Sequence, residues 1–164
     1  MGIKIVKGDM VKSMINGELQ AYAHQANCFC TMGRGIAPLL VEANPEVLKV
    51  DKETEKGCPY KLGGFSVTTD TSKPLVYNLY GQFHWSKFKT RGGINTDYDA
   101  LRDSLEGALE DMWKKGITQL GIPLIGCGLA GGDWDIVKDM VIGTSDWYQI
   151  NVTVFVLDDK YLED

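Results

Sequence analysis

The sequence predicts an α/β fold, built in layers around a mostly parallel or mixed sheet. Short apolar segments alternate along the chain with amphipathic segments of helical period, which is the pattern of layered α/β proteins. One apolar segment leads through a glycine-rich loop into a helix at residues 122–134. The chain has 164 residues, 44% of them hydrophobic and 24% charged, as expected for one soluble domain.

The first part of the chain predicts two strands and two helices. The first strand ends at Gly8-Asp9, and Gly17 ends the short helix that follows. Pro38 is tolerable only in the first turn of the second helix. The expected elements are a strand at residues 3–6, a helix at 10–16, a strand at 19–26 and a helix from Ile36 to Ala43. Residues 47–63 are polar and irregular, and we expect either a lid or an inert excursion there.

The second part predicts four strands and two helices. Their order is a strand at residues 65–69, a strand at 75–80, a helix at 98–112, a strand at 119–125, a helix at 133–144 and a strand at 152–157. Thr96 is the expected N-cap of the first of these helices, and Gly116 closes it. Pro123 removes a ladder donor, so it predicts a bulge or a position with a free N–H side. The last strand is apolar throughout, which predicts burial on both faces.

Charge and composition narrow the classes of function. The formal net charge of −5 argues against duplex nucleic acid as the main partner, because such proteins favour basic surfaces. We expect no membrane association, since no apolar run approaches the roughly 20 residues that span a bilayer. With no apolar signal segment we expect a cytoplasmic protein with free thiols. The spacing of Cys28, Cys30, Cys58 and Cys127 completes no metal set, so no metal or other cofactor is expected.

The glycine-rich loop is the most informative motif. It carries four glycines in residues 126–132 and reaches Asp133, a favourable N-cap. Glycine lets the backbone approach a ligand closely, and a helix N-terminus presents unpaired N–H groups with partial positive charge. Such a loop can bind phosphate without Lys or Arg. The alternative is an ordinary glycine-rich connection, because one such loop is a weak motif.

Polar or glycine-rich residues follow three other expected strands. They are Gly8-Asp9, then Asn27 with residues 32–37, and then residues 78–82. In layered α/β folds the ligands bind at the carboxyl ends of the strands. Two glycine loops that open helices, with an Asp and an Asn at neighbouring strand ends, suggest a long diphosphate ligand with a sugar and a base at its ends.

Four motifs together resemble the macro domain, an ADP-ribose-binding module. They are residues 7–9, 24–28, 32–37 and 125–129, and the resemblance covers nearly the whole chain. It implies one macro domain at residues 1–164, with a three-layer α/β/α fold and a central mixed, mostly parallel sheet. Within the family the chain looks closest to the branch of ADP-ribose 1″-phosphate phosphatases and the terminal ADP-ribose protein glycohydrolase.

The resemblance also implies which residues bind the ligand. Asp9 would accept a hydrogen bond from the adenine amino group, and Asn27 would hold the distal ribose. The loops 33–36 and 126–131 would enclose the diphosphate, while Leu157 and Asp158 would pack on the adenine. The full expected set is Asp9, Met10, Asn27, Gly33, Arg34, Gly35, Ile36, Tyr80, Gln82, Gly126, Cys127, Gly128, Leu129, Ala130, Gly131, Leu157 and Asp158.

Two departures from the family pattern bear on the reaction. The glycohydrolase branch uses a nucleophilic lysine after the fourth strand and an aspartate just after Gly-Cys-Gly-Leu. This chain has no lysine within residues 78–82, and Ala130 takes the place of the aspartate. A lysyl–ADP-ribose intermediate is therefore not expected.

The leading expectation is metal-independent hydrolysis of ADP-ribose 1″-phosphate to ADP-ribose and phosphate. Asp133, His24 and Asn27 are the candidate catalytic residues. Asp133 could equally be a plain N-cap. Strand alternation points His24 away from Asn27, which favours a supporting role for it. Arg34 could contact the terminal phosphate or simply be a solvated loop charge.

Two other functions stay open at this point. One is an ADP-ribosyl hydrolase that removes ADP-ribose from modified macromolecules, and the other is a non-catalytic ADP-ribose reader. In each case the expected partner is a small-molecule ligand, ADP-ribose or its 1″-phosphate, and we expect a monomer. Backbone-lined loops recognise the shared diphosphate, so they do not identify the true substrate.

Overall fold

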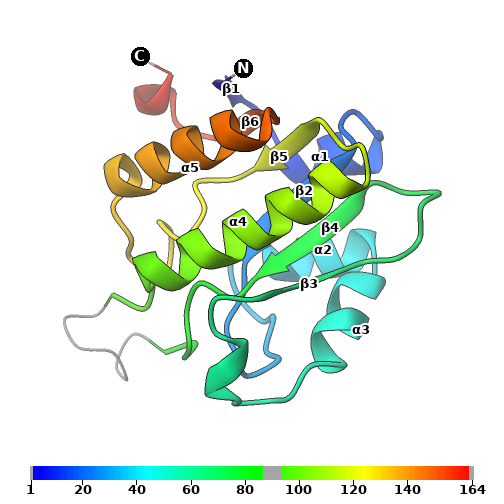
Figure 1. Cartoon of the computed structure of the whole chain (residues 1–164), viewed down its shortest axis with the longest axis vertical. Coiled ribbons are helices and arrows are strands. Elements are labelled where there is room, and N and C mark those ends of the chain that lie inside the picture. The colour runs from blue at the N-terminus through cyan, green and yellow to red at the C-terminus, as the bar shows by residue number, and fades with distance from the viewer. Residues whose placement is uncertain (1, 87–93, 163–164) are drawn as a thin grey trace.

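The computed structural model of the chain describes residues 2–86 and 94–162 (Figure 1). Its strands are β1 (Ile3–Lys7), β2 (Ala21–Gln25), β3 (Phe65–Val67), β4 (Leu75–Leu79), β5 (Gln119–Ile122) and β6 (Asn151–Val156). Its α-helices are α1 (Met10–Ile15), α2 (Ala37–Ala43), α3 (Glu46–Lys52), α4 (Tyr98–Lys114) and α5 (Trp134–Tyr148). Short 3₁₀ turns occur at Pro59–Lys61 and Asp159–Tyr161.

The strands form one sheet in the order β1-β6-β5-β2-β4-β3. All neighbours are parallel except β3, which runs antiparallel to β4. The expectation of a mixed, mostly parallel sheet is therefore confirmed. The parallel arrangement brings the carboxyl ends of β1, β6, β5, β2 and β4 to one edge, and β2 lies between β5 and β4 at the centre of that edge.

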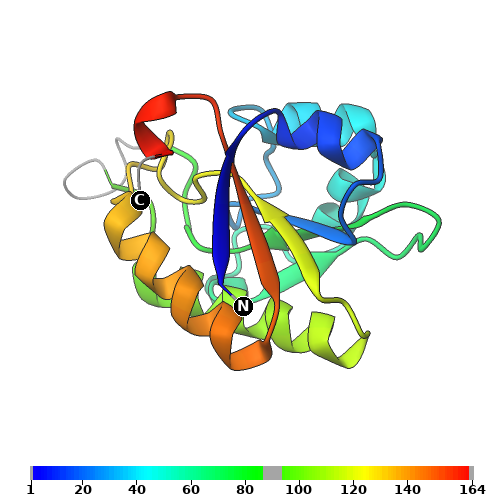
Figure 2. The same ribbon diagram turned by 90° about the horizontal axis from the view of Figure 1, so that it is seen from above.

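Helices cover both faces of the sheet, so the three-layer expectation is confirmed (Figure 2). Helices α4 and α5 lie on one face, and α1, α2 and α3 lie on the other. Ala21 and Ala23 of β2 belong to the large core on the α4–α5 side. Tyr22, between them, belongs to the smaller core on the opposite side. Alternate residues of β2 therefore point to opposite layers, as the strand period requires.

Aspartate side chains begin three of the helices. Asp9, Asp97 and Asp133 each accept a backbone N–H bond at the start of α1, α4 and α5, respectively. The expectation that Thr96 caps α4 was wrong, since its hydroxyl donates to the carbonyl of Gly126 instead. Gly116 follows α4 with a φ of +73°, which agrees with its expected role in ending that helix.

The expectation of an irregular segment at residues 47–63 was also wrong. Helix α3 begins at Glu46 and buries Val47 and Val50, and a 3₁₀ turn follows at Pro59–Lys61. The sequence pattern does not reveal this helix, because Val47 and Val50 span only one helical turn and charged residues flank them. Pro123 causes no conflict, since β5 ends at Ile122.

The last strand is less buried than expected. Val152, Val154 and Val156 are buried, whereas Thr153 and Phe155 are half-buried. The face of β6 that carries Thr153 and Phe155 is only partly covered, because β6 lies next to the edge strand β1. The sequence also predicts a loop at residues 81–95, of which residues 87–93 fall outside the described chain. No helix within the described residues is long and apolar enough to cross a membrane.

Candidate functional site

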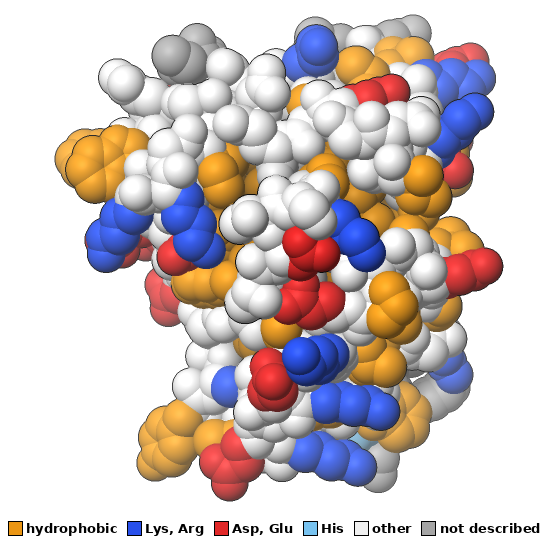
Figure 3. Space-filling model, turned by 90° about the vertical axis from the view of Figure 1, so that its right-hand side faces the viewer, with side chains coloured by type: hydrophobic (Ala, Val, Ile, Leu, Met, Phe, Trp, Pro, Cys, Tyr) orange, Lys and Arg blue, Asp and Glu red, His pale blue; other side chains and the backbone are white. Residues whose placement is uncertain are grey.

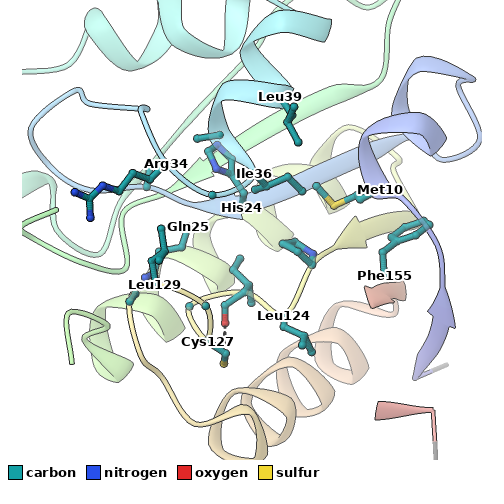
Figure 4. A pocket seen from close by; sticks show the side chains of 18 of the residues that line it. Met10, His24, Gln25, Arg34, Ile36, Leu39, Leu124, Cys127, Leu129 and Phe155 are labelled. Atoms are coloured by element: carbon teal, nitrogen blue, oxygen red, sulfur yellow. Dashed lines mark hydrogen bonds between the residues drawn. The ribbon is translucent and has the colours of Figure 1, made fainter. Parts of the chain in front are cut away.

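A cavity of about 950 Å³ opens at the carboxyl ends of the parallel strands (Figure 4). Its size is typical of sites for small organic ligands. Residues 8–11, 31–37, 123–130 and 155–158 supply most of its lining. We call residues 27–36 the first loop and residues 126–132 the second loop.

Figure 3 shows another face of the molecule, where Lys and Arg side chains are interspersed with Asp and Glu.

Most of the expected site residues line this cavity. They are Asp9, Met10, His24, Asn27, Gly33, Arg34, Gly35, Ile36, Gln82, Gly126, Cys127, Gly128, Leu129, Ala130, Leu157 and Asp158. Tyr80, Gly131 and Asp133 do not line it. The structure thus brings together segments more than a hundred residues apart in the sequence.

Tyr80 was wrongly expected among the ligand-binding residues. It follows β4 on the same face as Asn78, and this face turns toward α3. Its side chain is 1% exposed, and its hydroxyl donates to Oδ1 of Asp51 at 2.7 Å and pairs with Ser66 Oγ at 2.8 Å. Tyr80 therefore binds a buried carboxyl behind the sheet and not the ligand cavity.

Asp133 and Gly131 serve the local backbone. The Asp133 carboxylate accepts the N–H of Asp135 at 2.9 Å, and its own N–H donates to the Tyr98 hydroxyl at 2.9 Å. Gly131 has a φ of +76° and donates its N–H to the carbonyl of Gly128. The N-cap alternative for Asp133 is the one that the geometry supports, and its expected catalytic role is not.

The second loop lines the cavity with residues whose backbone N–H groups have no partner in the described chain. Its turns are closed by bonds from Cys127 N to Leu124 O and from Gly132 N to Gly126 O, at 3.1 and 2.8 Å. No hydrogen bond among the described residues uses the N–H groups of Gly128, Leu129 and Ala130. Three consecutive unpaired N–H groups beside a cavity can bind the oxygens of an anion.

The second loop is also tied to the segment that precedes α4. The carbonyl of Ala130 accepts the N–H groups of Asn95 and Thr96 at 2.8 and 3.3 Å. The Thr96 hydroxyl donates to the carbonyl of Gly126 at 2.6 Å. These bonds leave the loop preformed.

The first loop is anchored at its base by Asn27, whose side chain is almost fully buried. The Asn27 amide donates to the carbonyl and the hydroxyl of Thr31, both at 2.9 Å, and its Oδ1 accepts the N–H of Phe29 at 2.8 Å. Beyond Thr31, residues 33–35 are exposed. In the described chain, the backbone N–H groups of residues 33–36 also lack a hydrogen-bond partner.

His24 lies on β2 and faces the α1–α3 layer together with Tyr22. It is 1% exposed, and its Nε2 lies 2.6 Å from Oδ1 of Asn78. The Asn78 amide donates to the carbonyl of Val47, so its oxygen is the acceptor and the His24 ring is the donor. Burial lowers the pKa of His24 to about 4, while the Asn78 contact opposes this more weakly. His24 is therefore uncharged near neutral pH, and its one N–H is already used.

Asp9 connects the cavity to α1. Its Oδ1 accepts the N–H groups of Val11 and Lys12 at 2.9 and 3.2 Å. Phe155, Leu157 and Tyr161 line the cavity together with it. An aromatic and apolar wall next to a carboxylate fits a purine ring that carries an amino group.

Cys127 lines the cavity within the second loop, in surroundings that favour its protonated thiol. Its Sγ lies 3.2 Å from the carbonyl of Ile125. Desolvation, with a smaller contribution from the nearby Asp133 carboxylate, raises the pKa of this thiol to about 12. The thiolate is the reactive form, so these surroundings disfavour cysteine chemistry at this position.

Sequence reasoning missed several residues of the lining, notably Gln25, Trp85 and Phe155. For two of these residues, the alternation of side chains along a strand could have indicated a position in the lining. Gln25 is two residues beyond Ala23, and Phe155 lies between two fully buried valines of β6. Trp85 follows β4 in an irregular segment, where no periodicity is available.

The fold and the cavity define an α/β/α ligand-binding domain whose glycine loops suit a diphosphate. The family model of the Macro domain matches residues 23–141. The chain therefore belongs to the macro domain family.

The related proteins align with almost the whole length of this chain. An uncharacterized 17.5 kDa protein of Enterobacteria phage T4 is 36% identical, over 96% of this chain and 97% of its own. Human ADP-ribose glycohydrolase OARD1 is 28% identical, over 94% and 91%. The ADP-ribose 1″-phosphate phosphatase of Debaryomyces hansenii is 24% identical, over 95% and 99%. The solved macrodomain of Mycobacterium tuberculosis DarG has the same fold, with a TM-score of 0.73, 19% identity and coverage of 93% and 96%.

Proposed function

We propose that the protein binds ADP-ribose in this cavity and hydrolyses ADP-ribose 1″-phosphate to ADP-ribose and phosphate. One observation carries the proposal: two loops whose backbone N–H groups have no partner among the described residues border one cavity, at residues 33–36 and 128–130. Two such rows suit the two phosphates of a diphosphate, and they bind by dipoles and not by net charge. This also explains how a chain with a net charge of −5 binds an anion.

The residues that line the cavity indicate how the ligand would be oriented in it. Asp9, Phe155 and Tyr161 suit the adenine, and Asn27 and Arg34 belong to the first loop, where the distal ribose and its 1″-phosphate would bind. Arg34 is exposed in that loop and adds a cation to the backbone donors. Charge stabilisation of the 1″-phosphate by Arg34 is the main contribution to hydrolysis that these residues supply. Water is the second substrate of this hydrolysis.

A non-catalytic reader is the second candidate, and a specific observation favours it. Among the described residues near the expected distal ribose, no side chain is well suited to move a proton, because the carboxamides of Asn27 and Gln82 do not titrate and burial lowers the pKa of His24 to about 4. Asn27 holds the first loop, the His24 N–H donates to Asn78, and the Gln82 amide donates to the carbonyl of His84. A reader needs only the two rows of N–H groups.

The test is phosphorus NMR of the purified protein with ADP-ribose 1″-phosphate in EDTA. Loss of the anomeric phosphate signal with growth of orthophosphate supports the phosphatase. A static spectrum with ligand-induced broadening supports the reader. ADP-ribosylated protein is then the next substrate, because the human relative is an ADP-ribose glycohydrolase.

Arg34 offers a matched pair of variants for the same assay. In Arg34→Ala we expect KM for ADP-ribose 1″-phosphate to rise roughly threefold to tenfold, since a partly exposed charge contact contributes about 1 kcal/mol. Arg102→Ala removes the same charge from α4, where Arg102 pairs with Asp99 at 3.8 Å. That control should leave KM unchanged. Equal effects in both variants would reject a local role for Arg34.

A further inference from the structure

We propose that Gln25 is a positioning residue, which holds the second loop at the distance from the end of β4 that ligand binding requires. This inference rests on the proposed function, since the ligand in question is ADP-ribose. Gln25 is the last residue of β2, lines the cavity, and points toward the α4–α5 layer, on the same face as Ala21 and Ala23 (Figure 4).

Both hydrogens of the Gln25 amide are used. Nε2 donates to Oε1 of Gln82 at 2.8 Å and to Oγ1 of Thr96 at 3.0 Å. The Thr96 hydroxyl then donates to the carbonyl of Gly126 at 2.6 Å. We call Gln25, Gln82 and Thr96 the amide brace. It connects the central strand to the segment after β4, to the segment before α4 and to the second loop.

The oxygen of the same amide sets the spacing. Oε1 of Gln25 is buried and has no hydrogen-bond partner among the described residues. It lies against the α-carbons of Gly81 and Gly126, where an added Cβ on Gly126 would come within 3.0 Å of it and one on Gly81 would overlap it. The segments after β4 and β5 therefore approach one carbonyl group: a Cβ at Gly81 would force the Gln25 carboxamide to move, and one at Gly126 would crowd it. The packing leaves the amide little freedom to turn.

The brace also accounts for Gln82. Its Oε1 accepts from Gln25 and its Nε2 donates to the carbonyl of His84 at 2.9 Å, so both ends of its amide are used within the protein. Thr96 and Gln82 additionally form an isolated antiparallel bridge. Gln82 lines the cavity as part of a support and is not free to activate water.

The consequence for binding is geometric. The N–H groups of Gly128 to Ala130 follow Gly126 directly, so their position depends on where the Gly126 carbonyl is held. A carboxamide is required at position 25, because a carboxylate has no hydrogen to donate and would repel the acceptors that face it. Preorganised donors lose affinity quickly when they are displaced by a fraction of an ångström.

Gln20 provides a matched control at the other end of the same strand. Its Oε1 accepts the N–H groups of Thr118 and Gln119 at 2.8 and 3.1 Å, so it also connects β2 to the neighbouring segment of β5. It lies at the amino end of β2, away from the cavity. Gln25→Met and Gln20→Met remove the same amide and keep a similar side-chain volume.

The experiment measures Kd for ADP-ribose by titration calorimetry and Tm in both variants. We expect both to lower Tm, but only Gln25→Met to raise Kd, on the order of tenfold for the loss of two buried hydrogen bonds. Gln20→Met should leave Kd unchanged. A Kd in Gln25→Met within about twofold of wild type, at whatever Tm, would overturn the proposal.

A double-mutant cycle and hydrogen exchange complete the test. Thr96→Val removes the next link, so the double variant with Gln25→Met should bind no more weakly than either single variant, whereas additive losses would contradict a shared brace. In ligand-free protein, Gln25→Met should speed amide exchange at residues 126–132, and unchanged exchange would also overturn the brace. If wild-type protein binds no ADP-ribose, the proposed function fails, and exchange alone decides the role of Gln25.

Discussion

The two loops that border the cavity are held in different ways. The second loop has turns closed by its own backbone bonds, is paired to residues 95–96 through Ala130, and is fixed from β2 through Thr96. The first loop is anchored at its base by Asn27, and residues 33–35 beyond it are exposed. We infer that the preformed second loop supplies affinity for the shared diphosphate. The first loop, which carries Arg34, adapts to the group on the distal ribose.

The largest effect should come from crowding the second loop. A Cβ at Gly132 would overlap the carbonyl oxygen of Gly126, which is the acceptor for both Thr96 and Gly132 itself. Overpacking costs about 1–3 kcal/mol, so Gly132→Ala should weaken ADP-ribose binding roughly 10- to 100-fold by calorimetry. Gly143→Ala, on the exposed side of α5 with open space around its Cβ, should leave Kd unchanged. Wild-type affinity in Gly132→Ala would mean that the second loop is as adaptable as the first.

A pH dependence of stability should come from the strand that carries the first loop. Burial lowers the pKa of His24 from its ordinary value of 6.5 to about 4. Between these pH values the unfolded chain binds a proton at His24 and the folded chain does not. Stability therefore falls as pH is lowered through this range, by up to about 1.4 kcal/mol per pH unit. Urea unfolding at pH 7, 6 and 5 measures it.

The same urea unfolding series in two variants tests whether His24 causes the pH dependence of stability. His24→Gln should flatten the dependence, whereas His84→Gln, which changes the other histidine, should retain it. A curve for His24→Gln as steep as that of wild type would show that His24 is charged, or solvated, in the folded protein.

A smaller effect is expected from the anchor of the first loop. Asn27→Ala removes two donors and one acceptor that hold Phe29 and Thr31. We expect ADP-ribose to bind on the order of tenfold more weakly, at about 0.5–1.5 kcal/mol per net hydrogen bond. Asn16→Ala, beyond the end of α1, is the control. A loss as large as that in Gly132→Ala would remove the distinction between the loops.

The sequence predicted the features that depend on local chemistry. The apolar strands, the glycine loops and the Asp133 cap follow from residue type and spacing, and most of the expected ligand-binding residues line the cavity. Family resemblance added the order of the motifs. The resulting fold was predicted almost completely.

The errors depend on contacts between distant residues. Tyr80 lies at a strand end where a ligand residue is plausible, but its partner is Asp51 of α3, a helix that the sequence pattern did not reveal. Gln25 was overlooked because its importance comes from Gln82 and Thr96, which are far away in sequence. No periodicity encodes such pairings.

The strand order also bears on when the cavity can form. Edge strand β1 pairs with β6, so Ile3 to Lys7 adjoin residues that are synthesised long after them. Asp9, at the end of this first strand, and Phe155, on the last, belong to the same cavity wall. Pairing between such distant segments slows folding, because the chain must close a long loop before the contact is gained. A nascent chain that has not yet released β6 therefore cannot complete this cavity wall.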